Sequence, residues 1–190
     1  MPKTKKKTSR ARTSSPRKAP RSAAPAGPSM KAQFLDAFQR EHATTMKVLH
    51  AFPPEQSEFR PHPRSKCARE LLFTFALEQT LLSLGIQNQL KPGGGFPKAP
   101  PDFGAILGQF EKDYQGLVDL IKKTPEKELA ETTVPFPVGP GKMGDWPKLQ
   151  LAWFTLHDQI HHRGQFAVYL RMAGGKVPSI YGPSADEPWM

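Results

Sequence analysis

The sequence predicts an all-α protein, a four-helix bundle with a long connection between its third and fourth helices and a C-terminal coil. Three observations carry this prediction. Apolar residues recur at helical spacing in four segments, and runs rich in proline and glycine separate these segments. The chain of 190 residues has the length of one domain and a tail, and its 12 Phe and 3 Trp supply material for one core.

The first two predicted helices are joined by a loop that contains prolines. In the first helix, from Phe34 to about Ala51, apolar and small polar residues alternate at steps of three and four: Leu35, Phe38, His42, Thr45 and Leu49. The dipeptide Pro53-Pro54 ends this helix, and Pro61 and Pro63 keep the following loop out of helical conformation. The second helix is predicted from Ser65, as its N-cap, to about Leu90, just before the Gly93–Gly95 run.

The second pair of predicted helices is separated by a long connection. The third helix begins near Pro101-Asp102 and carries an apolar stripe as far as Ile121. Residues 124–145 are rich in proline and glycine, so we expect a long irregular connection in which residues 133–136 form a short extended piece. The fourth helix is predicted from Asp145, with Pro147 in its first turn, to Met172, and the last 15 residues read as a coil laid over the bundle.

Residues 1–29 differ in composition from the rest of the chain. They hold nine of the 27 Lys and Arg residues, no acidic residue, and no Leu, Ile, Val, Phe, Trp or Tyr. We therefore predict a disordered basic tail over residues 1–29, dispensable for folding, and a folded bundle over residues 30–190. The bundle keeps 18 cations against 17 acids, so any weak, non-specific contact with nucleic acid is expected through the tail alone. The alternative is an extension without a role.

The composition also excludes several classes of protein. A single cysteine excludes a disulfide framework within the chain and a zinc finger built on cysteines. No stretch approaches 18 apolar residues, so we expect no membrane span. Nothing in the sequence requires an oxidising compartment, and we expect a cytoplasmic protein.

Three of the six histidines fall within one short stretch of the fourth predicted helix. Residues four apart share a helix face, which gives two candidate chelating pairs, His157 with His161 and Asp158 with His162. The helix is apolar on more than one face, so the pattern alone does not decide which pair points inward. A buried Asp needs a cation or a donor, which favours the pair of Asp158 and His162. The alternative is a buried polar network that holds no metal.

The same helix carries a recognisable run of residues. His161-His162-Arg163-Gly164-Gln165, followed by Val168-Tyr169-Leu170-Arg171 and Gly174, resembles the last helix of the DinB family, the damage-inducible four-helix-bundle group. The similarity extends to Glu41–Thr45, Arg60–Pro63, Ala68–Leu72 and Pro178–Pro188, and so spans residues 30–190. The resemblance implies a dimeric bundle that holds nickel or zinc through three histidines. It also implies hydrolase or thiol S-transferase chemistry, in the latter case with a low-molecular-weight thiol as cosubstrate.

The ligand positions of this family match the chain only in part. His162 stands at the second histidine of the fourth helix, Asp158 at the first, and Thr74 at the histidine of the second helix. Glu78 lies one turn beyond Thr74 on the same face, and His42 is expected at the same height on the neighbouring antiparallel helix. We therefore predict a metal site of His42, Glu78, Asp158 and His162, whose mixed nitrogen and oxygen ligands suit Zn, Ni, Mn or Fe. The resemblance to the family implies Zn or Ni rather than Mn or Fe.

The sequence thus favours a divalent-metal-dependent enzyme of hydrolase or thiol-transferase type whose small-molecule substrate it does not specify. Gln165 and Tyr169, one and two turns beyond His162, are predicted to orient the substrate, and Arg163 to hold an anionic group. The alternative is a non-catalytic dimeric bundle that acts as a binding or interaction module in a stress response.

Overall fold

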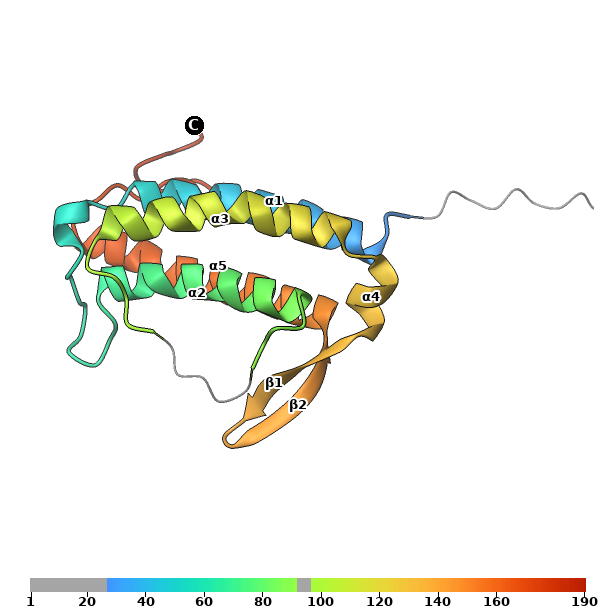
Figure 1. Cartoon of the computed structure of the whole chain (residues 1–190). Helices are drawn as coiled ribbons and strands as arrows, with labels where there is room; N and C mark the ends of the chain where they lie inside the picture. Colours follow the sequence, from blue (N-terminus) through green and yellow to red (C-terminus); the bar gives the residue numbers. More distant parts are fainter. Residues whose placement is uncertain (1–26, 92–96) are drawn as a thin grey trace, which may run out of the picture.

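The computed structural model describes residues 27–91 and 97–190. Its main elements are four long helices: α1 (Met30–His50) and α5 (Lys148–Met172) run in one direction, and α2 (Ala68–Ile86) and α3 (Phe103–Lys123) run in the opposite direction. In Figure 1, α1 and α3 form one layer and α2 and α5 the other. The remaining elements are a 3-10 turn (Pro54–Gln56), the short helix α4 (Glu126–Glu131) and the strands β1 (Thr133–Gly139) and β2 (Lys142–Pro147). The predicted all-α fold is confirmed.

Side chains just before the helices fix where they begin. The Ser29 hydroxyl accepts a hydrogen bond from the Ala32 amide at 3.3 Å, and the Asp102 carboxylate accepts one from the Ala105 amide at 2.8 Å. Cys67, and not Ser65, stands at the N-cap of α2, where the Glu70 carboxylate accepts a hydrogen bond from the Cys67 amide at 2.8 Å. The α2 helix also ends four residues earlier than predicted, at Ile86.

The buried core consists of two apolar clusters, one toward each end of the bundle. Along every long helix the two clusters are separated by a stretch in which polar side chains turn inward. The inward-facing members of this polar layer are His42 of α1, Gln79 of α2, Tyr114 of α3 and Gln159 of α5. Burying polar groups costs free energy unless they find partners, so such a layer in the middle of a bundle marks a site that stability alone does not explain.

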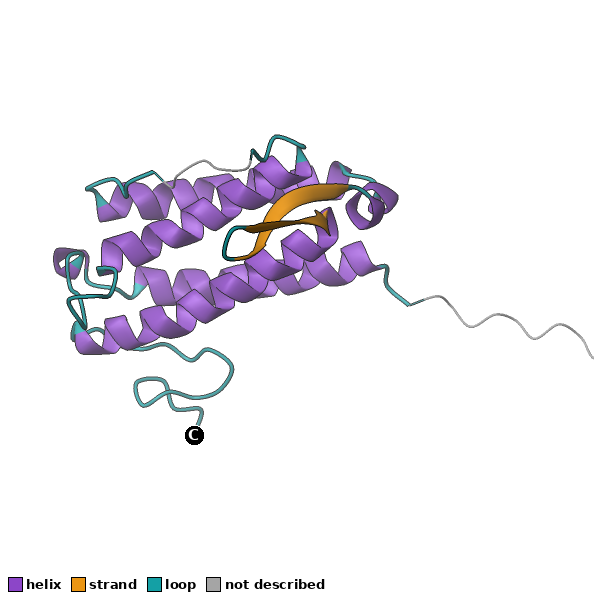
Figure 2. Ribbon diagram, turned by 90° about the horizontal axis from the view of Figure 1, so that it is seen from below, coloured by secondary structure: helices purple, strands orange, loops and turns teal. Residues whose placement is uncertain are grey.

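The connection between α3 and α5 is more ordered than the sequence predicted. It contains α4 and an antiparallel hairpin in which Thr133 pairs with Pro147 and Phe136 with Gly144. Gly141, with φ of +64°, makes the turn. Seen from below in Figure 2, the hairpin lies across one face of the bundle. The expected extended piece at residues 133–136 is confirmed as the start of β1, whereas Pro147 ends β2 instead of lying in the first turn of α5.

Two buried cations tie these peripheral segments to the bundle. The Lys148 ammonium donates to the Ile86 carbonyl at 2.7 Å and to the Glu128 carboxylate at 2.6 Å, and so joins α5, α2 and α4. The Arg163 guanidinium donates to the Tyr181 hydroxyl at 2.6 Å and pairs with the Glu41 carboxylate at 2.7 Å. The second set holds the C-terminal coil against α1 and α5.

Candidate metal centre

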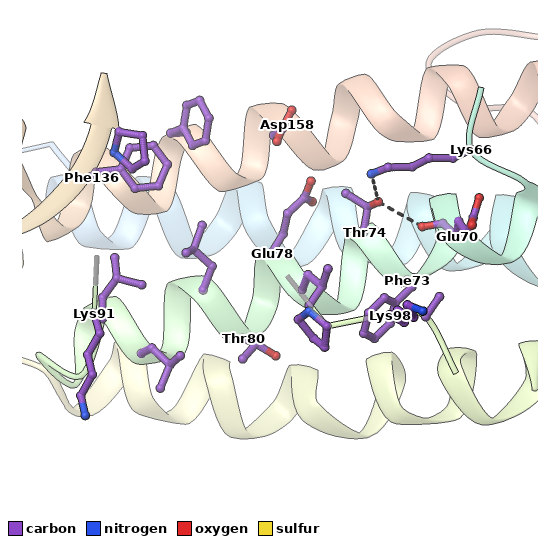
Figure 3. A pocket seen from close by; sticks show the side chains of 18 of the residues that line it. Lys66, Glu70, Phe73, Thr74, Glu78, Thr80, Lys91, Lys98, Phe136 and Asp158 are labelled. Carbon is purple, nitrogen blue, oxygen red and sulfur yellow. Dashed lines mark hydrogen bonds between the residues drawn. The ribbon is translucent and has the colours of Figure 1, made fainter. Parts of the chain in front are cut away.

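Glu78, Asp158 and His162 come together where α2 packs against α5. Asp158 and His162 are four residues apart on α5 and therefore share one face of that helix. Glu78, near the middle of α2, points toward this face (Figure 3). Its Oε1 lies 2.7 Å from Nδ1 of His162, and Oδ1 of Asp158 lies 3.9 Å from the same nitrogen. One ligand atom from each of the three residues lies within 4.8 Å of the others.

Burial sets the electrostatics of this triad. Glu78 is only 6% exposed, and its burial raises the pKa of the carboxyl from 4.5 to about 7. Burial by itself lowers the pKa of His162, but the hydrogen bond to Glu78 and the charges of Glu78 and Asp158 outweigh it and raise that pKa. The Glu78 carboxyl therefore titrates near neutral pH, and the two coupled groups share a proton between Oε1 and Nδ1.

The donor set of the triad fits a divalent transition metal. Two carboxylates and one imidazole are the oxygen and nitrogen ligands that Zn, Ni, Mn and Fe accept. The Oε2 atom of Glu78 is buried and has no hydrogen-bond partner within residues 27–91 and 97–190. A buried carboxylate oxygen without a partner is costly, and a coordinated cation removes that cost. A metal has to displace the shared proton, so binding should strengthen as pH rises.

The triad is reached from two adjoining pockets. Glu78 and Asp158 line a pocket of about 910 Å³, whose wall includes Phe136 of the hairpin (Figure 3). His162 lines a smaller pocket of about 450 Å³. Lys66 lines both pockets. Small molecules can therefore approach the triad from the carboxylate side and from the imidazole side.

His42 does not join this cluster, which corrects its assignment as a ligand. It lies in the polar layer, as its expected height implied, but its ring stacks on Tyr114 of α3 at 3.5 Å with an interplanar angle of 2°. The ring of Phe110 lies 5.4 Å away. The ring of His42 thus faces α3, and the triad consists of the other three predicted residues.

The other two histidines of α5 also lie outside the triad. His157 is exposed and rests against Trp153, with a distance of 5.8 Å between the ring centroids. His161 is exposed, and its Nε2 lies 2.8 Å from Nε2 of Gln165. The pair of His157 and His161 faces outward because it is rotated from Asp158 and His162 by one residue, about 100°.

The predicted substrate residues separate into two groups. Gln165 and Tyr169 line the smaller pocket beside His162, and the Tyr169 hydroxyl donates to the Lys66 carbonyl at 2.9 Å. Arg163 is only 1% exposed, and its guanidinium is occupied by Glu41, Thr45 and Tyr181. Arg163 therefore has a structural role and does not face either pocket, which corrects its assignment to an anionic group of the substrate.

Sequence reasoning missed the pocket residues that come from the loop before α2 and from the hairpin. Lys66 lies before α2, yet its ammonium donates to the Thr74 hydroxyl at 2.7 Å (Figure 3). Phe136 and Met143 reach the pocket from the hairpin. The only sequence signal for the hairpin was the short extended piece at residues 133–136, and no local pattern placed it beside α2.

The burial of His42 predicts a pH dependence of stability. Desolvation lowers its pKa from 6.5 to about 4, so the folded state keeps His42 neutral while the unfolded chain protonates it below pH 6.5. This contribution to stability is fully present above pH 6.5 and is lost as pH falls toward 4. We expect about 1 to 2 kcal/mol to be lost between about pH 7.5 and pH 5, after allowing for solvent screening.

Urea unfolding of the wild type and of His42→Phe at these two pH values measures this contribution, because Glu78 and His162 titrate equally in both proteins. The variant keeps the stacking on Tyr114 and should lose less stability on acidification. An identical loss in both proteins would show that His42 is protonated in the folded state.

Known proteins resemble the chain in sequence and in fold. A model of the DinB family matches residues 104–189, from α3 to the C-terminal coil. The YrdA protein of Bacillus subtilis strain 168 is 49% identical over 41 residues, or 22% of this chain, and the match spans a quarter of that relative's length.

Two solved structures share the fold. A DinB-like protein from Bacillus cereus aligns with a TM-score of 0.64 and 24% identity, over 78% of this chain and 95% of its own. A DinB-like protein of Bacillus subtilis, YjoA, aligns with a TM-score of 0.57 and 16% identity, over 83% of this chain and 99% of its own.

None of the helices in the described ranges is long and apolar enough to cross a membrane.

The sequence and structure matches agree with the helical bundle described above. The family match covers the helix that carries Asp158 and His162. The family model over residues 104–189 and the fold shared with the two DinB-like structures support membership of the DinB family.

Proposed function

We propose that the protein binds one divalent metal ion through Glu78, Asp158 and His162 and uses it in a hydrolase or thiol-transferase reaction on a small molecule. The observation that carries the proposal is the convergence of three ligand atoms within 4.8 Å around a buried carboxylate whose second oxygen has no partner in the described part of the chain. The mixed oxygen and nitrogen donors suit Zn, Ni, Mn and Fe, and the resemblance to the DinB family favours Zn or Ni among them.

A divalent metal held there lowers the pKa of a coordinated water or thiol, which supplies a nucleophile at neutral pH. The residues around it have separable tasks. Glu78 and His162 share a proton across the 2.7 Å between Oε1 and Nδ1, and they would release it when they bind the metal. Asp158 is half-buried and faces the larger pocket, where a substrate arrives. Gln165 and Tyr169 border the smaller pocket and are suited to orient a low-molecular-weight thiol or a second reactant.

Further parts of the proposal rest on the family and the composition. We propose a homodimer in the cytoplasm that responds to damage or stress. Weak contact with nucleic acid is assigned to residues 1–29, which carry nine cations and lie almost entirely outside the described residues.

A second candidate function has its own support. Glu78 and His162 are hydrogen-bonded to each other at 2.7 Å, so each supplies the other with a hydrogen-bond partner without a metal. A polar network of this kind suits a non-catalytic dimeric bundle that acts as a stress-related binding or interaction module.

Turnover by the metal-loaded protein separates the two functions. The full chain, loaded with zinc or stripped by a chelator, is assayed for hydrolysis of p-nitrophenyl acetate and for conjugation of cysteine to 1-chloro-2,4-dinitrobenzene. We expect metal-dependent turnover in one assay and its loss in Asp158→Asn, while Asp113→Asn on the exposed face of α3 keeps it. Stoichiometric metal without turnover in either assay would instead favour the binding module.

A further inference from the structure

The larger pocket carries more positive charge than its own acidic residues balance. Its lining includes five cations and three acids: Arg60, Arg64, Lys66, Lys91 and Lys98, with Glu70, Glu78 and Asp158. Arg60 pairs with Glu70 at 3.2 Å, and the other two acids belong to the metal triad. The remaining four cations form no ion pair with any residue in the described ranges.

This excess is local and does not follow from the charge of the whole bundle. Residues 30–190 carry 18 Lys and Arg against 17 Asp and Glu, a net charge of +1. Four uncompensated cations around one pocket are therefore a feature of that pocket. They raise the local concentration of anions there.

Lys66 is the cation best placed to meet a ligand. Its ammonium donates to the Thr74 hydroxyl at 2.7 Å, and that hydroxyl in turn donates to the Glu70 carbonyl at 3.2 Å. These bonds hold the charge over α2, one helical turn before Glu78, and Figure 3 shows Lys66 and Glu78 on the same side of the helix. An anion that contacts Lys66 therefore also lies beside the metal triad.

The rest of the wall is mainly apolar and includes three aromatic side chains, Phe73, Phe136 and Phe154. It includes Phe73 and Leu77 of α2, Phe136 and Met143 of the hairpin, and Phe154 of α5. The rings of Phe136 and Phe154 lie 5.1 Å apart. Phe154 and Met143 are 37% and 49% exposed, so they present apolar surface that a ligand can cover.

We propose that the larger pocket binds amphipathic anions, small molecules whose carboxylate or phosphate head group contacts Lys66 and whose apolar body packs against Phe136 and Phe154. This inference names the substrate class of the proposed metal-dependent reaction. The claim that the bound anion is a substrate rests on that proposed function. A divalent metal also balances the charges of Glu78 and Asp158, so loading should strengthen anion binding rather than oppose it.

Two fluorescent probes that differ by one charge test the proposal on the full chain. The probes are 8-anilinonaphthalene-1-sulfonate and its uncharged analogue N-phenyl-1-naphthylamine, titrated in about 0.15 M salt to screen distant charges. We expect Lys66→Met to weaken binding of the sulfonate about fivefold, as for a partly exposed charge contact, and to leave the neutral probe unchanged. Phe154→Ser should weaken both probes.

The matched control is Lys112→Met, which removes an exposed lysine of α3 outside both pockets. The basic tail is present in every variant, so its own contribution cancels. Equal effects of Lys66→Met and Lys112→Met on the sulfonate, or an equal loss of the neutral probe in Lys66→Met, would overturn the proposal.

Competition then identifies the head group. We expect 1-naphthoate or 1-naphthyl phosphate to displace the sulfonate from zinc-loaded protein more strongly than 1-naphthol does. The anion that displaces it more strongly identifies the preferred head group as a carboxylate or a phosphate. If 1-naphthol displaces it as well as both anions, the proposal is wrong. Zinc titration of the same samples separates the anion-binding claim from the metal-binding claim. If the sulfonate binds in a Lys66-dependent way but the protein takes up no zinc, the anion pocket stands and the metal-dependent function is wrong.

Discussion

His162→Ala should lose zinc affinity by at least about a hundredfold, whereas His161→Ala should retain the wild-type affinity. His162 supplies the only imidazole of the triad, and loss of a group that merely supports a metal ligand already costs about 10- to 100-fold. His161 is adjacent in sequence but exposed, and its Nε2 is directed to Gln165. The comparison therefore changes the same residue type on the same helix, inside and outside the triad.

Competition against a chromophoric chelator, on protein without a histidine tag, measures both affinities. Circular dichroism confirms that each variant is folded. Equal losses in the two variants would favour the outward face of His157 and His161 and would contradict the triad.

Arg163→Met should lower the free energy of unfolding by about 3 to 5 kcal/mol, because it removes one partner of a buried charge pair. The guanidinium is 1% exposed, pairs with Glu41 at 2.7 Å, and also donates to Thr45 and Tyr181. Methionine fills similar volume, so most of the loss comes from the unpaired Glu41 carboxylate and the released C-terminal coil.

Urea unfolding of Arg163→Met, compared with Arg40→Met, tests this prediction. Arg40 pairs with Asp36 on the exposed surface of α1, so its replacement should leave stability nearly unchanged. If Arg163→Met unfolds like the wild type but fails to bind the charged naphthalene probe, Arg163 would be a ligand contact and its structural assignment would be wrong.

The sequence predicted the four long helices because each carries a full apolar stripe between proline or glycine breakers. It did not predict the hairpin, because Pro135 and Pro137 weaken any strand signal. Both prolines are tolerated since a two-stranded sheet has only edge strands. The order in residues 124–147 depends on distant contacts such as that of Lys148 with Ile86, which no local window contains.

The candidate site was predictable in part from helix geometry. The spacing of four residues gave Asp158 and His162 as one of two candidate pairs, and the need of a buried Asp for a partner favoured it. Glu78 was placed one helical turn after Thr74, the position that the resemblance matches to a histidine of the family. The prediction of His42 gave the correct polar layer but the wrong direction, because its ring faces α3 and stacks on Tyr114. Lys66 could not be foreseen, since its place depends on a loop that folds back along α2 to Thr74.

Anomalous scattering at the zinc absorption edge, from crystals of the full chain prepared with zinc and without a histidine tag, tests the central claim most directly. The account predicts one strong peak for each chain, between the Glu78 carboxylate, the Asp158 carboxylate and the His162 ring. The absence of a peak there, with the Glu78 and His162 hydrogen bond intact, would contradict a metal centre and leave the three residues as a polar network. A peak at His157 and His161 alone would contradict the choice of face.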